Sequence, residues 1–160
     1  MNKPVRKPFD KQLLDNHDPI AREAIRDYIG RSGLYVKDNP DTYGPDLIVY
    51  KGFKPLSFVE VEVKLVWKPE QNVFPWDTIQ LPERKKKFLN LGLPIEFFVL
   101  RADLERAVLI PDYVVANSPV EEVKNKYVKV GELFCRIDIR ECQVIDITPE
   151  VENNEPDQNK

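Results

Sequence analysis

The amino-acid sequence predicts an α/β protein in which a central mixed β-sheet is flanked by helices. Helix-like and strand-like patterns alternate along the chain, and 42% of its 160 residues are hydrophobic, enough for one core but not for two of ordinary size. In chain order, the expected elements are a helix at 19–30, strands at 34–36, 47–50 and 58–67, a helix at 82–91 and a strand at 95–100. We therefore expect one domain over 13–150, with a flexible segment at 1–12 and a disordered tail at 151–160.

Both helices carry boundary signals. Asp18 can cap the first helix and Pro19 suits its first turn, where no amide donor is needed. Gly30 or Gly33 can end it. Its apolar side comprises Ile20, Ala21, Ala24, Ile25, Tyr28 and Ile29. The second helix opens at Pro82, runs to about Leu91 and stops at Gly92.

The strand patterns predict a covered sheet. Residues 47–50 are apolar on both faces, which is typical of a central strand. In FVEVEVKLVW, at 58–67, the valines, Leu65 and Trp67 point to one face, while Glu60, Glu62 and Lys64 point to the other. Beyond residue 105, AVLIPDYVV and YVKVGELFCRIDIRECQVIDI predict a strand, a short helical turn and a hairpin or pair of strands that extends or covers the sheet. We expect this C-terminal β extension to complete the domain.

Charge and composition exclude some classes. The net charge of −3 gives no global positive field, so a nucleic-acid partner would need a local basic patch. The sequence has no apolar stretch near the roughly 20 residues of a membrane span, and its start lacks the apolar centre of a signal peptide. We therefore expect a soluble cytoplasmic protein without a membrane partner. Cys135 and Cys142 could pair, but two reduced thiols are expected in such a chain.

Acidic residues recur around the second and third strands. Asp46 follows Gly44 and Pro45 at the start of one strand, and after the turn KGFKP the next strand carries Glu62, Val63 and Lys64. A turn before a strand and a solvated strand face would explain these residues without any chemistry. However, two carboxylates about 4 Å apart repel by roughly 4 kcal/mol at an effective dielectric constant of about 20. A divalent cation would remove that cost.

The pattern Pro45-Asp46, then Glu62-Val63-Lys64, resembles the motif of the PD-(D/E)xK nuclease superfamily, and the order helix, three strands, helix, strand resembles its restriction endonuclease-like core. The segment WDTIQLPERKKKF looks like the one that follows the catalytic strand in phage-type and in resolvase- or repair-like members, where a glutamine, here Gln80, precedes or opens the next helix. The resemblance implies a metal-dependent nuclease that hydrolyses phosphodiesters by in-line attack of a metal-activated water, with DNA favoured over RNA as substrate and cleavage at ends or at internal sites left open.

The resemblance also implies site residues. Asp46, Glu62 and the Val63 backbone carbonyl would bind Mg²⁺, or Mn²⁺ in its place, since these oxygen ligands suit hard cations and no His or Cys lies nearby. Lys64 would orient the attacking water, assist its deprotonation or stabilise the transition state. Glu60 could bind a second metal ion, or pair with Lys64 or a neighbouring strand. Glu23, on the first helix, could reach the metal or remain a solvated residue beside Arg26 and Arg31.

The run Arg84 to Lys87 predicts substrate contacts. At 100° per residue, Arg84 and Lys85 fall in the apolar sector of their helix, and positive charge is unfavourable in a first turn. We expect Arg84 and Lys85, with Gln80, to bind phosphates, the alternative being side chains that lie along the core edge. The acidic composition favours a homodimer or a protein partner for substrate binding, or a different function as a non-catalytic nucleic-acid-binding or structural module with the same fold.

Overall fold

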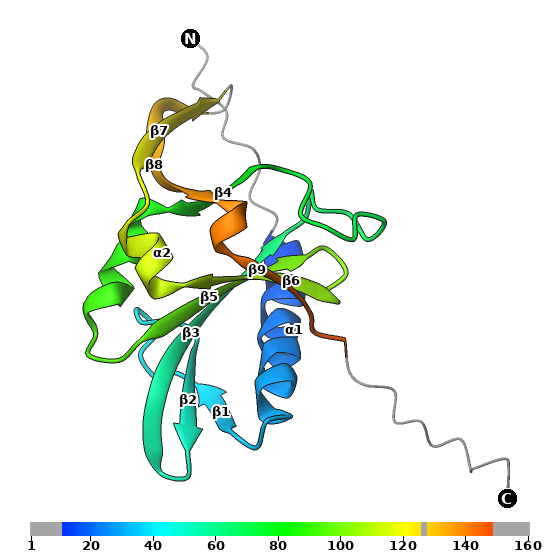
Figure 1. Ribbon diagram of the computed structural model, residues 1–160, viewed down its shortest axis with the longest axis vertical. Helices are drawn as coiled ribbons and strands as arrows, with labels where there is room; N and C mark the ends of the chain where they lie inside the picture. The colour runs from blue at the N-terminus through cyan, green and yellow to red at the C-terminus, as the bar shows by residue number, and fades with distance from the viewer. Residues whose placement is uncertain (1–10, 126–127, 149–160) are drawn as a thin grey trace, which may run out of the picture.

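The computed structural model describes residues 11–125 and 128–148 (Figure 1). The expected flexible segment at 1–12 lies largely outside these residues, and the expected tail at 151–160 lies wholly outside them. The first helix, α1 (Lys11–Gly30), ends where predicted but begins earlier, with Pro19 inside it. The predicted start is wrong because Lys11 to Leu14 are good helix formers that extend the helix across the proline.

A six-stranded mixed sheet has the order β1-β2-β3-β5-β6-β9. Its strands are β1 (Tyr35–Asp38), β2 (Leu47–Lys51), β3 (Lys54–Lys64), β5 (Ile95–Arg101), β6 (Arg106–Pro111) and β9 (Gln143–Asp146). Strands β3 and β5 are parallel, and the other neighbours are antiparallel. The predicted α/β class with a central mixed sheet flanked by helices is confirmed, and the order α1-β1-β2-β3, helix, β5 is consistent with the restriction endonuclease-like core.

A smaller sheet, β4-β8-β7, covers one face of the large sheet. Its strands are β4 (Thr78–Pro82), β7 (Val120–Asn125) and β8 (Val128–Asp138). Strand β4 is not among the predicted strands, because it gains its backbone partners from the distant strand β8. The C-terminal strands were predicted either to extend the sheet or to cover it, and they do both. Strand β9 extends the large sheet, while β7 and β8 help to cover it.

The second predicted helix is a 3₁₀ helix, η1 (Glu83–Asn90), which starts directly after Pro82. The chain leaves it through Gly92, whose φ of 91° favours glycine and agrees with the predicted stop. A short helix, α2 (Asp112–Ala116), follows β6, and a 3₁₀ turn, η2 (Ile139–Glu141), precedes β9. None of the helices that the structure describes is both long enough and apolar enough to cross a membrane.

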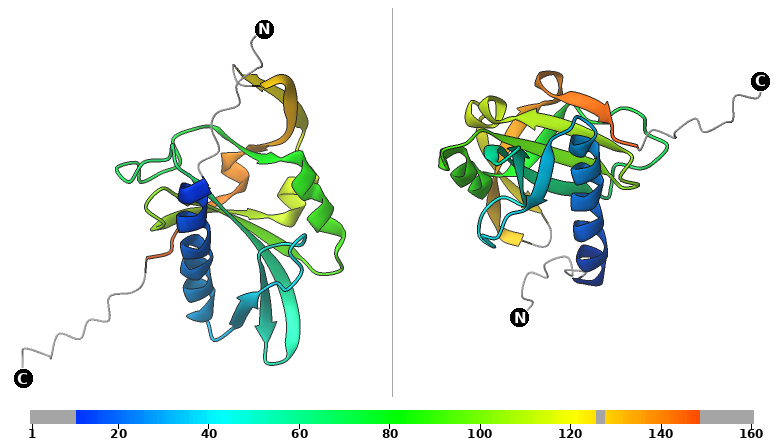
Figure 2. Two further views of the ribbon diagram at one scale, coloured as in Figure 1. Left: turned by 180° about the vertical axis from the view of Figure 1, so that it is seen from behind. Right: turned by 90° about the horizontal axis from the view of Figure 1, so that it is seen from below.

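Two cores lie on opposite faces of the large sheet. Helix α1 packs on one face over Val59, Val61 and Phe98. On the other face, η1, α2 and the small sheet enclose a core around Phe97 and Val99, and Figures 1 and 2 show these elements opposite α1. Both cysteines are free thiols, as predicted. The face of β3 that carries its glutamates is therefore the face between the two sheets.

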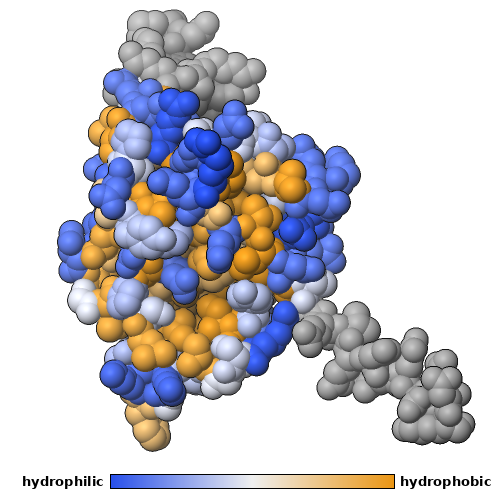
Figure 3. Space-filling model, in the orientation of Figure 1, coloured by the Kyte–Doolittle hydropathy of each residue, from blue (hydrophilic) through white to orange (hydrophobic). Residues whose placement is uncertain are grey.

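We expect Phe97→Ala to lower the free energy of unfolding by about 3–5 kcal/mol, because Phe97 is only 1% exposed in the core between the sheets. Phe53 provides a matched control. It is fully exposed in the β2–β3 turn, which projects at the lower end of the molecule in Figures 1 and 3, and Phe53→Ala should change stability by less than about 0.5 kcal/mol. Urea unfolding measures both, and equal losses would contradict this description of the core.

Candidate functional site

Asp46 is fixed where β2 begins. The β2–β3 register places it beside Glu60: the Asp46 N–H donates to Glu60 Oε1 at 3.1 Å, and the Val61 N–H donates to Asp46 Oδ2 at 2.8 Å. In the preceding turn, Asn39 Nδ2 donates to the Pro45 carbonyl at 2.9 Å. A Cβ on Gly44 would lie 2.6 Å from that same Nδ2, so a larger residue would have to displace the Asn39 side chain and disturb its hydrogen bond. The Gly-Pro-Asp turn thus aims a carboxylate at β3.

Glu60, Glu62 and Lys64 share the face of β3 that lies under the small sheet and η1. Glu60 is only 9% exposed, so the alternative of a fully solvated strand face is wrong at this position. The side chain of Glu62 is 30% exposed, and Lys64, nearer the end of the strand, is also half-buried. A buried carboxylate needs a partner because burial removes its hydration.

That partner is Lys85, from η1. Its Nζ lies 3.0 Å from Glu60 Oε2 and 2.5 Å from Glu62 Oε1, and the residue is 8% exposed. A 3₁₀ helix has three residues per turn, so Lys85 shares a side with Phe88, which packs into the core. Phe88 thereby holds the backbone of η1 over the acids. Lys85 lies on the apolar side, as the helical phase predicted, but its ammonium faces carboxylates.

The site is rich in coupled charges. Burial raises the pKa of Glu60 to about 7; the Lys85 ammonium opposes this shift and the neighbouring Asp46 carboxylate adds to it. Burial alone would lower the pKa of Lys85, but Glu62 and Glu60 outweigh it and raise that pKa. Lys85 therefore remains a cation, while Glu60 lies close to the balance between its neutral and ionised forms near pH 7.

Lys64 is directed toward the loop between β3 and β4. Its Nζ lies 5.6 Å from the centre of the Trp76 ring, a cation–π contact. Trp67 and Phe74 of this loop are buried and pack edge to face, so they serve the core, whereas Trp76 is 40% exposed. Trp76 in turn packs edge to face on Phe74. The partner of Lys64 is therefore carried by a loop that is anchored in the core.

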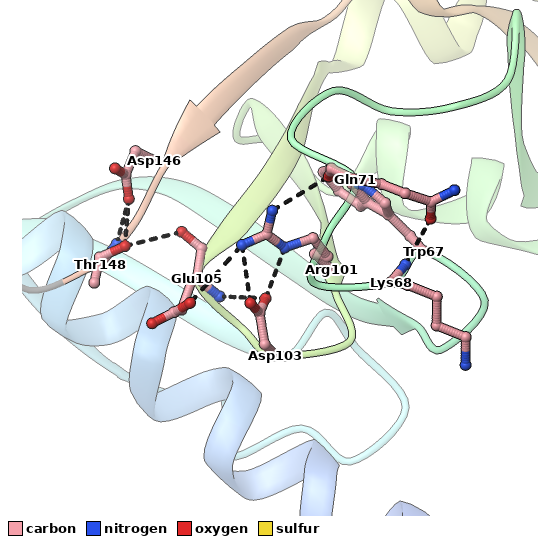
Figure 4. Close-up of polar contacts among 8 residues, drawn as sticks. All are labelled: Trp67, Lys68, Gln71, Arg101, Asp103, Glu105, Asp146 and Thr148. Carbon is pink, nitrogen blue, oxygen red and sulfur yellow. Dashed lines mark hydrogen bonds and ion pairs between the residues drawn. The ribbon is translucent and has the colours of Figure 1, made fainter.

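Arg101, at the end of β5, anchors the same loop (Figure 4). It is 5% exposed, and its Nη1 donates to the Gln71 carbonyl at 3.2 Å, which also accepts from Trp67 Nε1 at 2.9 Å. Asp103 binds the guanidinium at 2.8 and 2.9 Å. In the parallel register Arg101 is opposite Lys64, so it supports the end of the site. Sequence reasoning missed it, and only its place at the end of a buried strand could have indicated it.

The other predicted residues lie farther out. Gln80, on β4, donates to Glu121 Oε1 at 3.1 Å, and Arg84 is exposed at the start of η1. Arg84 was expected on the apolar side of its helix, but the 3₁₀ period groups it with the exposed Lys87. Glu23 pairs with Arg26, the local partner considered from the sequence, and its side chain is 57% exposed. The structure therefore brings together Asp46, Glu60, Glu62 and Lys85, with Lys64 on the same face of β3.

The donors suit a hard divalent cation, since they are carboxylates and one backbone carbonyl. Within 11–125 and 128–148, however, no three Asp, Glu, His or Cys side chains form a ready metal-binding group. Lys85 contacts Glu60 and Glu62 instead. The ligand chemistry thus fits Mg²⁺, and binding it requires these side chains to adjust.

Comparison with known proteins gives little beyond the fold. No protein-family model and no curated protein matches the chain. Among solved structures, the chain is similar to Hjc from Archaeoglobus fulgidus, a Holliday junction resolvase from an archaeal hyperthermophile, with a TM-score of 0.42 and 11% identity over 80% of this chain and 84% of that chain. This similarity is too low to transfer an activity or residue roles. The function has to follow from the site itself.

In metal-free buffer, the free energy of unfolding should fall as pH rises from about 4.5 to about 7, because folded Glu60 keeps its proton over a range in which the unfolded chain has lost it. Glu60→Gln should remove this part of the fall, on the order of 3 kcal/mol. Urea unfolding between pH 4.5 and 8 measures it. Glu70→Gln, in the exposed part of the loop, is the control. An identical pH dependence in the wild type and Glu60→Gln would contradict the assignment.

Proposed function

We propose that the chain is a divalent-metal-dependent phosphodiester hydrolase of the PD-(D/E)xK type, acting as an endonuclease on DNA. One observation carries this proposal: Asp46, Glu60 and Glu62 gather at neighbouring strands, and the buried cation that contacts the two glutamates is a single ammonium. When both glutamates are ionised, they share one ammonium, which leaves an excess of negative charge on this pair. A divalent ion would neutralise it.

In the proposed site, Asp46, Glu62 and the Val63 carbonyl would hold Mg²⁺ or Mn²⁺, with Glu60 as a further acid beside them. When bound, the ion would polarise a phosphate and lower the pKa of a water molecule. The Val61 N–H already holds the Asp46 carboxylate against β3, whereas Glu62 would have to leave Lys85 to bind the ion. Glu23 is not proposed as a ligand, because its exposed side chain lies on α1, which packs on the face of the large sheet opposite Glu60 and Glu62.

Lys64 is proposed to orient the attacking water, help remove its proton or stabilise the charge that develops on phosphorus-bound oxygens. Its position supports this, because it lies two residues beyond Glu62 on the same face of β3. The Trp76 ring and the loop held by Arg101 restrict where the ammonium can lie. Such restriction favours a fixed position relative to a bound phosphate.

Binding of DNA would depend on basic side chains near the site. Arg84 is exposed at the start of η1, one residue before Lys85, and it is proposed to contact a backbone phosphate. Gln80 would join it only by giving up its hydrogen bond to Glu121. Because the net charge is −3, we also propose that a second copy or a protein partner contributes to DNA binding. DNA is proposed over RNA on the family resemblance of the motif.

A non-catalytic nucleic-acid-binding module is the second candidate. The observation that favours it is that Lys85 already neutralises part of the charge of Glu60 and Glu62 without any metal ion. A domain that has replaced its metal ion with an ammonium would retain the fold and bind DNA without cleaving it. The two candidates differ in one result, the Mg²⁺ dependence of cleavage.

We expect Asp46→Asn, Glu62→Gln and Lys64→Met each to reduce Mg²⁺-dependent cleavage by at least about 10²-fold, because each removes a proposed metal ligand or the ammonium of the reaction. The assay is a gel with duplex, single-stranded and branched DNA and with RNA, with and without Mg²⁺. Glu141→Gln, which changes an exposed acid on η2, should cleave like the wild type.

Two results would contradict the proposed enzymatic activity. Cleavage by all three site variants at the wild-type rate would exclude the assigned residues. Binding of DNA by the wild type without cleavage of any substrate in Mg²⁺ or Mn²⁺ would favour the non-catalytic module.

A further inference from the structure

Lys85 occupies the position from which a metal ion would compensate the glutamates. Its ammonium contacts both Glu60 and Glu62, at 3.0 and 2.5 Å, and the residue is 8% exposed. No comparable contact joins Lys64 to the acids, because its ammonium lies at the Trp76 ring. The cation that holds this site together is therefore supplied by η1, from outside the sheet.

We propose that Lys85 is a tethered counter-ion that competes with the divalent ion for Glu60 and Glu62 and leaves them when the ion binds. This inference rests on the proposed function, since it assumes that these acids take part in metal binding. It assigns Lys85 a role other than a permanent phosphate contact, because a side chain held by two acids cannot bind phosphate at the same time.

Charge makes the two occupants exclusive. An ammonium and a divalent ion on the same carboxylates would lie within a few ångströms of each other and repel strongly at the low dielectric of a buried site. Without either cation, the two glutamates would be left desolvated and mutually repulsive. In the absence of metal, Lys85 supplies the positive charge that compensates the ionised glutamates.

The structure also offers a way for Lys85 to leave. The side chain of Glu62 is 30% exposed, which opens the ion pair to solvent on one side. The lysine side chain has a flexible four-carbon stem, and Phe88 anchors the backbone of η1 independently of the ammonium. The charged end can thus rotate away from the acids while η1 stays in place. The affinity for the divalent ion is then reduced by the cost of this exchange.

Chemical labelling of the wild-type protein tests the exchange directly. Reductive methylation followed by mass spectrometry should find Lys85 protected in EDTA and labelled at least about tenfold faster in saturating Mg²⁺. The reason is that the state in which the Lys85 ammonium has left the glutamates changes from the minor to the major one when the ion binds. Lys86, a half-buried neighbour on the same helix, should react at the same rate in both conditions. Protection of Lys85 that is unchanged by bound Mg²⁺ would overturn the inference.

Calorimetric titration with Mn²⁺ provides a second readout that does not depend on cleavage. Lys85→Met keeps the apolar stem of the side chain but removes the ammonium that competes with the metal ion. This variant should bind Mn²⁺ at least about tenfold more tightly than the wild type, because the wild-type state in which Lys85 has left the glutamates is the minor one. Lys86→Met should bind like the wild type. If Lys85→Met does not fold, the labelling of the wild type decides alone.

The outcomes separate the two proposals. Wild-type protein that binds Mn²⁺ as tightly as Lys85→Met would overturn the competition and leave the proposed function intact. Failure of both proteins to bind Mn²⁺ would overturn the metal-dependent function itself, and with it the inference.

Discussion

The ion pairs of Lys85 with Glu60 and Glu62 are the contact on which the arrangement of the site depends. They join η1 to the central strand of the large sheet across the core between the two sheets. The buried Glu60 and the half-buried Glu62 would otherwise oppose folding, and removing one partner of a buried ion pair typically costs about 3–5 kcal/mol. Lys85 compensates their charge where η1 covers this face.

The same contact explains how a largely apolar core accommodates a polar site. Phe97 and Val99 of β5 pair in register with Glu60 and Glu62 of β3, so the apolar and charged side chains lie side by side on one face. Asp46 is added just before β2, where the Val61 N–H donates to its carboxylate. The acids are thus arranged by backbone pairing and need no ligand to bring them near one another. What a ligand would change is the position of Lys85.

Much of this fold could be predicted from the sequence, because its signals are local. The alternation predicted the two faces of β3 correctly as far as Lys64, where the strand ends, and Pro82 with Gly92 indicated the limits of η1. Beyond the strand the prediction was wrong, since Trp67 packs in the core opposite the one that the valines enter. Strand β4 could not be predicted, since its hydrogen bonds come from β8.

The candidate site was harder to predict than the fold. Alternation along a strand separates its two faces without showing what covers them, so the burial of Glu60 could not be predicted. A period of 3.6 residues put Arg84 on the wrong side of a helix whose period is three. Lys85, the partner of the acids, could not be identified from the sequence, because it lies 25 residues after Glu60 and meets it only through tertiary packing.

The proposed cation site, formed by Asp46 and the acids of β3, is one that a divalent ion can take from Lys85. Anomalous diffraction from crystals soaked in Mn²⁺ tests this proposal most directly. A manganese peak is expected between Asp46, Glu62 and the Val63 carbonyl, with the Lys85 ammonium withdrawn from both glutamates. Crystals at saturating Mn²⁺ that show no peak there, and Lys85 still on Glu60 and Glu62, would contradict it.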